Sequence, residues 1–415
     1  MKILHTADWH LGQTFYEFDR SFEHQEFLYW LVATIQENDI DCLIISGDVF
    51  DLSNPSTTSV RMFYTFLSDV VKAQPHLQII VTAGNHDSAS RLESPKPLLE
   101  SSNIHIIGTI DRDINGSIDF EKLVIPIKNK NSEIDIWCLA IPFLRLGDYP
   151  AVPSSNSPYS SGVAELYKQA YEYALTKKKQ GQAVIAMGHL HTLDAEVTEH
   201  DKHERLIMGG VEFVPVSVFH KDIIYTGLGH IHKAQSFGVK GNVRYSGSPI
   251  PMSFAELDYT HRVIVFEVKN EEVINLRDVE IPLTVKLLRV PLSPCQLPEV
   301  FLALQQLPDE GENMGIAPFL EVRVLLDGPE PALRHKIETA LENKHVRLAK
   351  IDVKYHKSDA AQADAVLTYD KLHELDPASV FNRMYKSRFQ VDPPDNISTL
   401  FIEVVNQINT REDQG

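Results

Sequence analysis

Short apolar runs typical of buried strands recur along the first part of the chain, and five of them end in a polar cluster. The runs are Ile3–Ala7, Cys42–Ser46, Ile79–Ala83, Ala183–Met187 and Ile223–Gly227. The clusters that follow contain Asp8 and His10, Asp48, Asn85 and His86, His189, and His230 and His232. Because strands of an open α/β sheet end at a shared edge, the pattern predicts that these five loops gather in one place.

The later part of the chain has a different pattern. Residues 262–279 alternate apolar and polar positions, which predicts strands, and Pro282 marks a join. From 284 to 357 the pattern predicts strand, helix, strand, helix and strand. The predicted ranges are Val285–Val290, Leu297–Leu307, Phe319–Leu326, Leu333–Leu341 and Val346–Tyr355.

A polar stretch at 358–364 precedes a final segment, residues 365–410, with helical periodicity. Asp376 suits a helix N-cap and Pro377 a first helical position. Apolar stripes follow on both sides of a break at residues 392–395. Two short amphipathic helices are therefore expected, which either pack on their own domain or grip the coiled coil of a partner.

Composition is that of an ordinary globular protein. With 415 residues, 43% hydrophobic and 23% charged, the chain is expected to form two or three domains. It begins directly with a strand-like run, and we expect neither a signal peptide nor a membrane span. Cys42 and Cys138 lie in apolar runs and are expected to be buried thiols, and Cys295 stands alone. The absence of a disulfide pattern favours the cytoplasm.

The polar clusters carry donors for divalent metals. Carboxylate, amide oxygen and imidazole suit an ion such as Mn²⁺ better than a thiolate site does. A carboxylate can bridge two ions roughly 3.5–4 Å apart, and Asp48, in the middle of the set, is the candidate bridge. Such ions acidify water, so a hydroxide nucleophile forms near neutral pH. His86, next to Asn85, is the candidate to protonate the leaving oxygen.

Each of these residues, taken alone, is more often a cap, a turn residue or a satisfied polar group, and Gly-Asp and Gly-Asn are common turns. The ordered set is more specific. Asp-x-His, Gly-Asp, Gly-Asn-His-Asp and Gly-His-x-His occur in this order, each after an apolar run. The joint pattern predicts a two-metal phosphoesterase site.

These ordered motifs resemble those of the calcineurin-like metallophosphoesterases. Longer stretches are similar to the SbcD family of bacterial nuclease subunits, namely Ala7–Gln13, Ser46–Asp51, Ala83–Ser88, Ile141–Arg145 and Tyr245–Pro251. The last two are not general phosphatase motifs, so they carry the narrower resemblance. The resemblance is strong up to about residue 280. Beyond that point it lies in the order of the predicted elements more than in shared motifs.

The resemblance implies a role for each position. One ion is expected on Asp8, His10, Asp48 and His232, and the other on Asp48, Asn85, His189 and His230. His86 matches the family's catalytic histidine. His191 matches no ligand and is expected at the pocket edge or in solvent. Asp51 stands where archaeal and eukaryotic relatives have a histidine, and Asp87 is expected to orient a neighbouring imidazole.

The resemblance also implies an α/β fold. A two-sheet metallophosphoesterase sandwich is expected over residues 1–280, followed by a small α/β capping domain over 284–357 that restricts DNA entry. The helical segment 365–410 is expected to bind the coiled coil of an SbcC-like ATPase. For the region 284–357, a plain stability or dimer domain is the alternative.

An assembly of two such chains with two SbcC chains is implied, trimming double-strand ends and opening hairpins in replication, recombination and repair. Mn²⁺ is the expected activator, with Mg²⁺ the weaker alternative. ATP is expected to act through SbcC, because this chain lacks a Gly-x-x-x-x-Gly-Lys-Ser/Thr loop.

The net charge of −18 argues against strong DNA binding by the isolated chain, because phosphate contacts dominate nonspecific affinity. The basic runs Lys128–Lys130 and Lys177–Lys179 are more often solvated loops or helix ends. A partner is therefore expected to supply much of the DNA grip. Two other functions stay open: a phosphatase acting on a non-DNA substrate with the same metals, and a non-catalytic clamp subunit.

Overall fold

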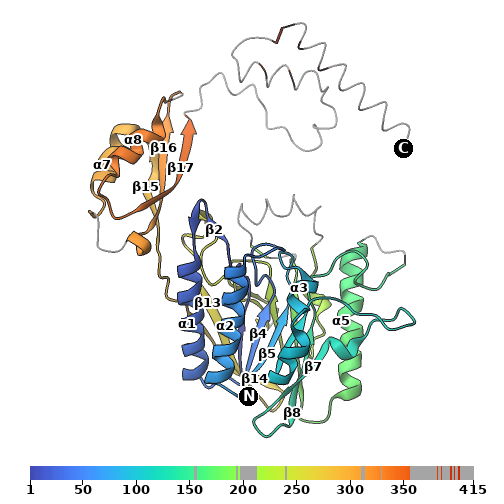
Figure 1. Ribbon diagram of the computed structural model, residues 1–415. Coiled ribbons are helices and arrows are strands. Elements are labelled where there is room, and N and C mark those ends of the chain that lie inside the picture. Colours follow the sequence, from blue (N-terminus) through green and yellow to red (C-terminus); the bar gives the residue numbers. More distant parts are fainter. Residues whose placement is uncertain are drawn as a thin grey trace. The chain divides into compact units, whose positions relative to one another are not determined.

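The computed structural model describes residues 1–153, 157–192, 195–196, 213–238, 241–309, 314–328 and 330–355, and also residues 381, 385, 393, 394, 397 and 401. Met1–Lys354 and Tyr355–Gly415 form two separate compact units. The first unit contains two six-stranded sheets and a small third sheet of three strands. Both large sheets contribute to one buried apolar layer, so they form the predicted sandwich (Figure 1).

The first large sheet has the order β14-β13-β1-β4-β5-β6. Its strands are β1 (Lys2–Thr6), β4 (Cys42–Ser46), β5 (Gln78–Thr82), β6 (Ile104–Ile107), β13 (Arg262–Lys269) and β14 (Glu272–Glu280). β1, β4, β5 and β6 run parallel, with Ile3 beside Cys42 and Cys42 beside Gln78. Every residue of β4 and β5 is buried, because both faces of the sheet are covered.

The second large sheet has the order β11-β12-β10-β9-β8-β7. Its strands are β7 (Val124–Lys128), β8 (Ile134–Ala140), β9 (Ala183–His189), β10 (Tyr225–Gly229), β11 (Gln235–Phe237) and β12 (Val243–Tyr245). β8, β9, β10 and β12 run parallel, so their carboxyl ends share one edge. The five predicted ligand-bearing strands are thus confirmed, three in the first sheet and two in the second.

Helices cover the outer faces of the sandwich. α1 (Ser21–Glu37) and α2 (Thr57–Ala73) lie beside the first sheet, and α5 (Pro158–Lys177) lies on the opposite side (Figure 1). Ser56 is the N-cap of α2, and its hydroxyl accepts a hydrogen bond from the Ser59 amide at 3.1 Å. The shorter elements are β2 (Thr14–Phe15), β3 (Phe18–Asp19), α3 (Ala89–Glu93), α4 (Lys96–Leu99), η1 (Glu100–Ser102), η2 (Phe120–Lys122), η3 (Val216–Val218), η4 (Phe254–Glu256) and η5 (Met314–Ile316).

The small sheet follows the predicted order of strand, helix, strand, helix and strand. Its elements are β15 (Leu287–Cys295), α7 (Leu297–Gln305), β16 (Phe319–Leu326), α8 (Leu333–Ala340) and β17 (Arg347–Tyr355). Val300, Leu304 and Ile337 of the two helices are buried in its own apolar cluster. Phe319 also stacks on Phe15 at 4.7 Å between ring centroids, so the small sheet shares an aromatic contact with the sandwich.

Cys42 and Cys138 are free and fully buried, as predicted. In the second unit, the described residues 381, 385, 397 and 401 are helical, and the rings of Phe381 and Phe401 stack at 4.3 Å. The rest of the predicted helical segment 365–410 lies outside the described residues. Over the part of the chain that the structure describes, no helix combines the length and apolar character of a membrane span.

His5 connects the two large sheets. From β1 of one sheet, its Nδ1 lies 2.9 Å from the hydroxyl of Tyr225 on β10 of the other. The side chain is fully buried, and this burial lowers the pKa of His5 from 6.5 to about 3. The folded chain therefore excludes a proton that the unfolded chain binds below pH 6.5. Stability is lost as the pH falls from there towards 3.

We expect His5→Gln to flatten the acid side of the stability profile. The slope of the unfolding free energy against pH, between about pH 6 and pH 4, should decrease by about 1.4 kcal/mol per pH unit, the contribution of one proton. Urea denaturation at several pH values measures this slope. His76→Gln, at an exposed position, is the control for removing an imidazole. Equal slopes in the wild type and His5→Gln would contradict the assignment.

Candidate metal centre

The predicted ligand residues come together at the shared edge of the two sheets. Donor atoms of His10, Asp48 and His86 lie within 4.8 Å of one another, and so do those of Asp48, His189 and His230. Asp48 belongs to both groups, which is what a bridging carboxylate requires.

Several of these residues have an unusual backbone conformation. Asp8, His10, Asp48 and His230 have positive φ angles of 55°, 46°, 49° and 97°, a region that residues other than glycine rarely occupy. Loop-to-loop hydrogen bonds stabilise this conformation. The amides of Asp8 and His10 donate to the carbonyls of Gly47 and Asp48, each at 3.0 Å. Strain of this kind is typical of functional sites, where the surrounding structure over-determines the backbone.

The glycines of the Gly-Asp and Gly-Asn motifs make room for the neighbouring donors. A Cβ atom at Gly84 would lie 2.1 Å from Asp48 Oδ1, and one at Gly47 would lie 2.2 Å from His189 Nδ1. Any side chain at either position would displace a candidate ligand. The motifs thus reflect the close packing of the loops as well as the turns themselves.

His10 and His232 face each other on one side of Asp48. The Nδ1 atom of His10 lies 3.2 Å from Asp51 Oδ1, and that of His232 lies 3.1 Å from Glu256 Oε1. A carboxylate only accepts, so each Nδ1 donates to its carboxylate, and Nε2 is the atom of each ring that faces the other ring. These two Nε2 atoms lie 3.2 Å apart. At this distance the two Nε2 atoms can share a proton or bind one cation together.

His189 occupies the other side of Asp48. Its Nδ1 lies 2.9 Å from the carbonyl oxygen of Ser46, so its Nε2 faces Asn85 Oδ1 at 2.8 Å and Asp48 Oδ2 at 3.2 Å. Burial alone would lower the pKa of His189, but the Asp48 carboxylate raises it to about 9. Burial likewise opposes ionisation of Asp48, yet His189 holds the pKa of Asp48 well below its usual range. This side of the site also favours a positive charge.

Asp8 and His230 complete the set. The His230 amide donates to Asp8 Oδ1 at 2.8 Å, and His230 Nδ1 lies 3.0 Å from Asn85 Oδ1. Burial raises the pKa of Asp8, and its Oδ2 is buried without a hydrogen-bond partner among the described residues. Carboxylate, amide and imidazole donors, one of them an orphaned buried oxygen, fit divalent ions of the Mn²⁺ or Mg²⁺ type.

His86 lies against this group. Its Nδ1 donates to the carbonyl oxygen of Asp51 at 2.7 Å, because a carbonyl only accepts. Its ring meets the ring of His10 edge to face, with centroids 4.8 Å apart. The geometry alone therefore admits two roles for His86, a metal ligand or a proton donor.

One sequence expectation was wrong. Asp87 does not orient an imidazole: its carboxylate accepts from the backbone amides of Gly84, Phe50 and Val49 at 2.9, 3.0 and 3.2 Å. Burial, with the nearby Asp48 charge, raises the pKa of Asp87 to about 6. Of the two places expected for His191, the pocket edge and solvent, the structure excludes solvent, since only 1% of the residue is exposed. The ring of His191 lies 5.9 Å from that of His230.

Glu256 was missed by sequence reasoning. It is fully buried and contacts His232 from 24 positions along the chain. No local motif announces this contact, because it depends on how η4 packs against the loop after β10. The sequence marked Asp51 only as a position where relatives have a histidine. Its contacts with His10 and His86 could be recognised only in the folded structure.

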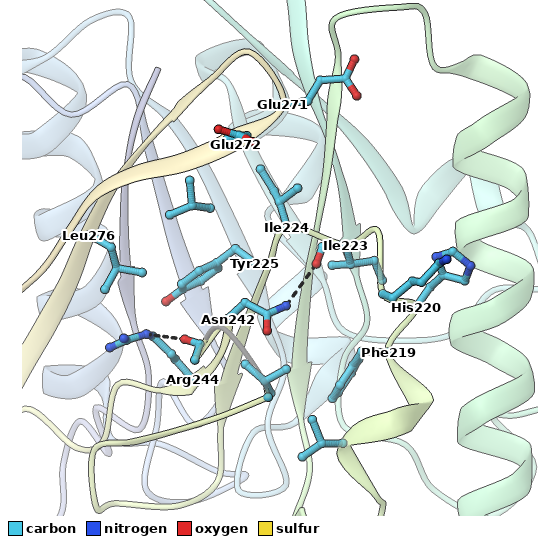
Figure 2. Close-up of a pocket in the computed structure, with 16 residues that line it drawn as sticks. Phe219, His220, Ile223, Ile224, Tyr225, Asn242, Arg244, Glu271, Glu272 and Leu276 are labelled. Atoms are coloured by element: carbon cyan, nitrogen blue, oxygen red, sulfur yellow. Dashed lines mark hydrogen bonds between the residues drawn. The ribbon is translucent and has the colours of Figure 1, made fainter.

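A separate cavity of about 570 Å³ lies near the start of β10, whereas the candidate ligands follow the end of that strand (Figure 2). Two of its polar side chains are hydrogen-bonded to backbone carbonyls. Asn242 donates to the Ile223 carbonyl at 3.2 Å and Arg244 to the Gly241 carbonyl at 2.8 Å. We therefore place the chemistry at the strand ends and not in this cavity.

Residues 1–234 match the family model for calcineurin-like phosphoesterases, and residues 284–389 match that for the type 5 capsule protein repressor C-terminal domain.

Similar curated proteins are named as the SbcD component of the nuclease SbcCD. The one from Rhodobacter capsulatus is 35% identical over 360 residues, 85% of this chain and 87% of that protein. The Escherichia coli K12 protein is 29% identical over 92% of both chains, and the Bacillus subtilis protein is 30% identical over 66% of this chain and 67% of its own. Sequence similarity of this extent, together with the match over the phosphoesterase region, shows that the chain belongs to the SbcD family of nuclease subunits, within the calcineurin-like phosphoesterases.

Proposed function

We propose that this chain hydrolyses DNA phosphodiesters with two divalent ions, Mn²⁺ being the expected activator. One ion is assigned to Asp8, His10, Asp48 and His232, and the other to Asp48, Asn85, His189 and His230. The observation that carries this proposal is the position of Asp48 between the two sets of ligands, with its Oδ2 3.7 Å from His10 Nε2 and 3.2 Å from His189 Nε2. When bound, such a pair of ions supplies Lewis-acid stabilisation of phosphate charge and acidifies water.

His86 is assigned the proton transfer to the leaving sugar oxygen. The hydrogen bond from its Nδ1 to the Asp51 carbonyl, at 2.7 Å, leaves Nε2 as the atom that takes up and releases a proton. The protonated ring can then donate from Nε2 to the departing oxygen. The bond to the carbonyl also fixes the plane of the ring, which limits the reorganisation that the step requires.

An SbcC-like coiled-coil ATPase is the proposed partner, with two copies of each chain in the complex. The relatives named above are components of SbcCD, which supports this assignment. The charge of the chain also supports a partner that contacts DNA. The net charge is −18, Lys130 lies 2.7 Å from Asp39, and Lys178 lies 3.1 Å from Glu271. These lysines are already paired, so much of the DNA grip is assigned to the partner.

We further propose that residues 284–357 cap the site and limit which DNA ends enter it, and that the segment 365–410 binds the partner. The small sheet supports the first assignment through its contact with the sandwich: Phe319 stacks on Phe15, on β2, a few residues after the ligand His10.

The division of roles predicts different metal contents for two variants. Asp48→Ala should lose both ions, because the shared carboxylate is removed. His86→Ala should retain both ions and lose phosphodiester hydrolysis by a factor of about 10² or more. Metal analysis by inductively coupled plasma spectrometry on the purified variants measures this directly. Equal metal loss in the two variants would make His86 a ligand and overturn the assignment.

The substrate assignment predicts a preference for diesters. With Mn²⁺, the chain should cleave bis-p-nitrophenyl phosphate and end-labelled duplex or hairpin DNA in preference to p-nitrophenyl phosphate. Cleavage of DNA should increase when an SbcC-like partner and ATP are added, and His86→Ala should abolish it. A preference for the monoester would instead favour a phosphatase. DNA processing by the complex that is unchanged in His86→Ala would favour a non-catalytic clamp.

A further inference from the structure

Three of the four candidate imidazole ligands differ in the group that their Nδ1 atom contacts. Each Nδ1 atom of His10 and His232 contacts a carboxylate, from Asp51 and Glu256 respectively. His189 instead donates from Nδ1 to a neutral backbone carbonyl, that of Ser46. An anionic acceptor makes an imidazole a more basic ligand than a neutral one does. The two halves of the site are therefore chemically unequal, although each contains two imidazoles.

Glu256 is held rigidly in its position. It is fully buried, and its Oε1 lies 3.1 Å from His232 Nδ1. Its Oε2 accepts from the Met252 amide at 2.8 Å and from the Ser248 hydroxyl at 3.4 Å. With donors on both oxygens, the carboxylate cannot rotate without losing a hydrogen bond. The ring of His232 is thereby held with Nε2 toward His10.

Asp51 acts on His10 through its side chain and on His86 through its backbone. Its Oδ1 lies 3.2 Å from His10 Nδ1, whereas its carbonyl oxygen accepts from His86. A substitution of the side chain therefore removes the carboxylate behind His10 and leaves the acceptor of His86 in place. This separation allows the metal-orienting function to be tested without removing the partner of the proposed proton donor.

We propose that Glu256 and Asp51 are positioning residues that orient His232 and His10 toward one shared ion and make that ion the more tightly bound of the two. The inference rests on the proposed function, since it concerns the ion assigned to Asp8, His10, Asp48 and His232. Neither carboxylate touches the ion in this assignment. Each acts through the tautomer and orientation of the imidazole in front of it.

Glu256→Gln is the most direct test, because it is isosteric and yet cannot satisfy both neighbours. If the amide oxygen accepts from the Met252 amide, the NH₂ group faces His232 Nδ1 and drives the proton to Nε2, where it blocks metal binding. If the amide turns around, the NH₂ group meets the Met252 N–H. Either arrangement should weaken the tighter Mn²⁺ site by roughly 10- to 100-fold.

Titration of the metal-free protein with MnCl₂, followed by the electron paramagnetic resonance signal of free Mn²⁺, measures both affinities. The wild type should bind two ions with distinct affinities. Glu256→Gln and Asp51→Ala should each weaken the tighter site selectively and leave the weaker one in place. Glu321→Gln is the matched control, since Glu321 is a buried carboxylate that pairs with Arg289 and Lys350 in the small sheet. It should leave both affinities unchanged.

Thermal unfolding of each metal-free variant checks the fold, and Asp51→Ala decides the question if Glu256→Gln does not fold. Unchanged affinities in the folded variants, or equal weakening of both sites, would overturn the inference while leaving the two-ion site intact. A wild-type chain that binds fewer than two ions would instead overturn the proposed function itself. The two failures are therefore distinguishable.

Discussion

Polar side chains from the other strand-end loops converge around the carboxylate of Asp48, and this convergence is the constraint on which the rest of the site depends. In the metal-free chain this convergence has a cost, because Asp8 Oδ2 is buried without a hydrogen-bond partner among the described residues. Left-handed backbone at the ligands adds strain. The sandwich must therefore hold the site together in the absence of metal.

A hydrogen bond between the two sheets stabilises the site from below. Ser46, the last residue of β4, donates from its hydroxyl to the Gly227 carbonyl of β10 at 3.0 Å. Its own carbonyl accepts from His189 Nδ1 at 2.9 Å. One residue thus connects the sheets and orients a candidate ligand. β4 is buried along its whole length. The loop that follows β4, which carries Asp48, is therefore anchored in the close-packed core.

Much of this arrangement could be predicted from local pattern. Strands ending at His189 or just before Asp8 and Asp48 follow from apolar runs and the polar residues after them, and the small sheet follows from its alternating strand and helix periodicity. The residues behind the ligands could not be predicted. Glu256 reaches His232 through the tertiary packing of η4, and Asp87 binds three backbone amides that only the folded loops bring together. Local periodicity contains no information about such contacts.

Anomalous diffraction at the manganese absorption edge, from crystals of this chain grown with Mn²⁺, tests the central claim most directly. The account predicts two peaks roughly 3.5–4 Å apart. The Asp48 carboxylate should contact both peaks, through one of its oxygens or through both. A single peak, or a pair of peaks of which only one contacts Asp48, would contradict the bridging role and with it the two-ion account of the site.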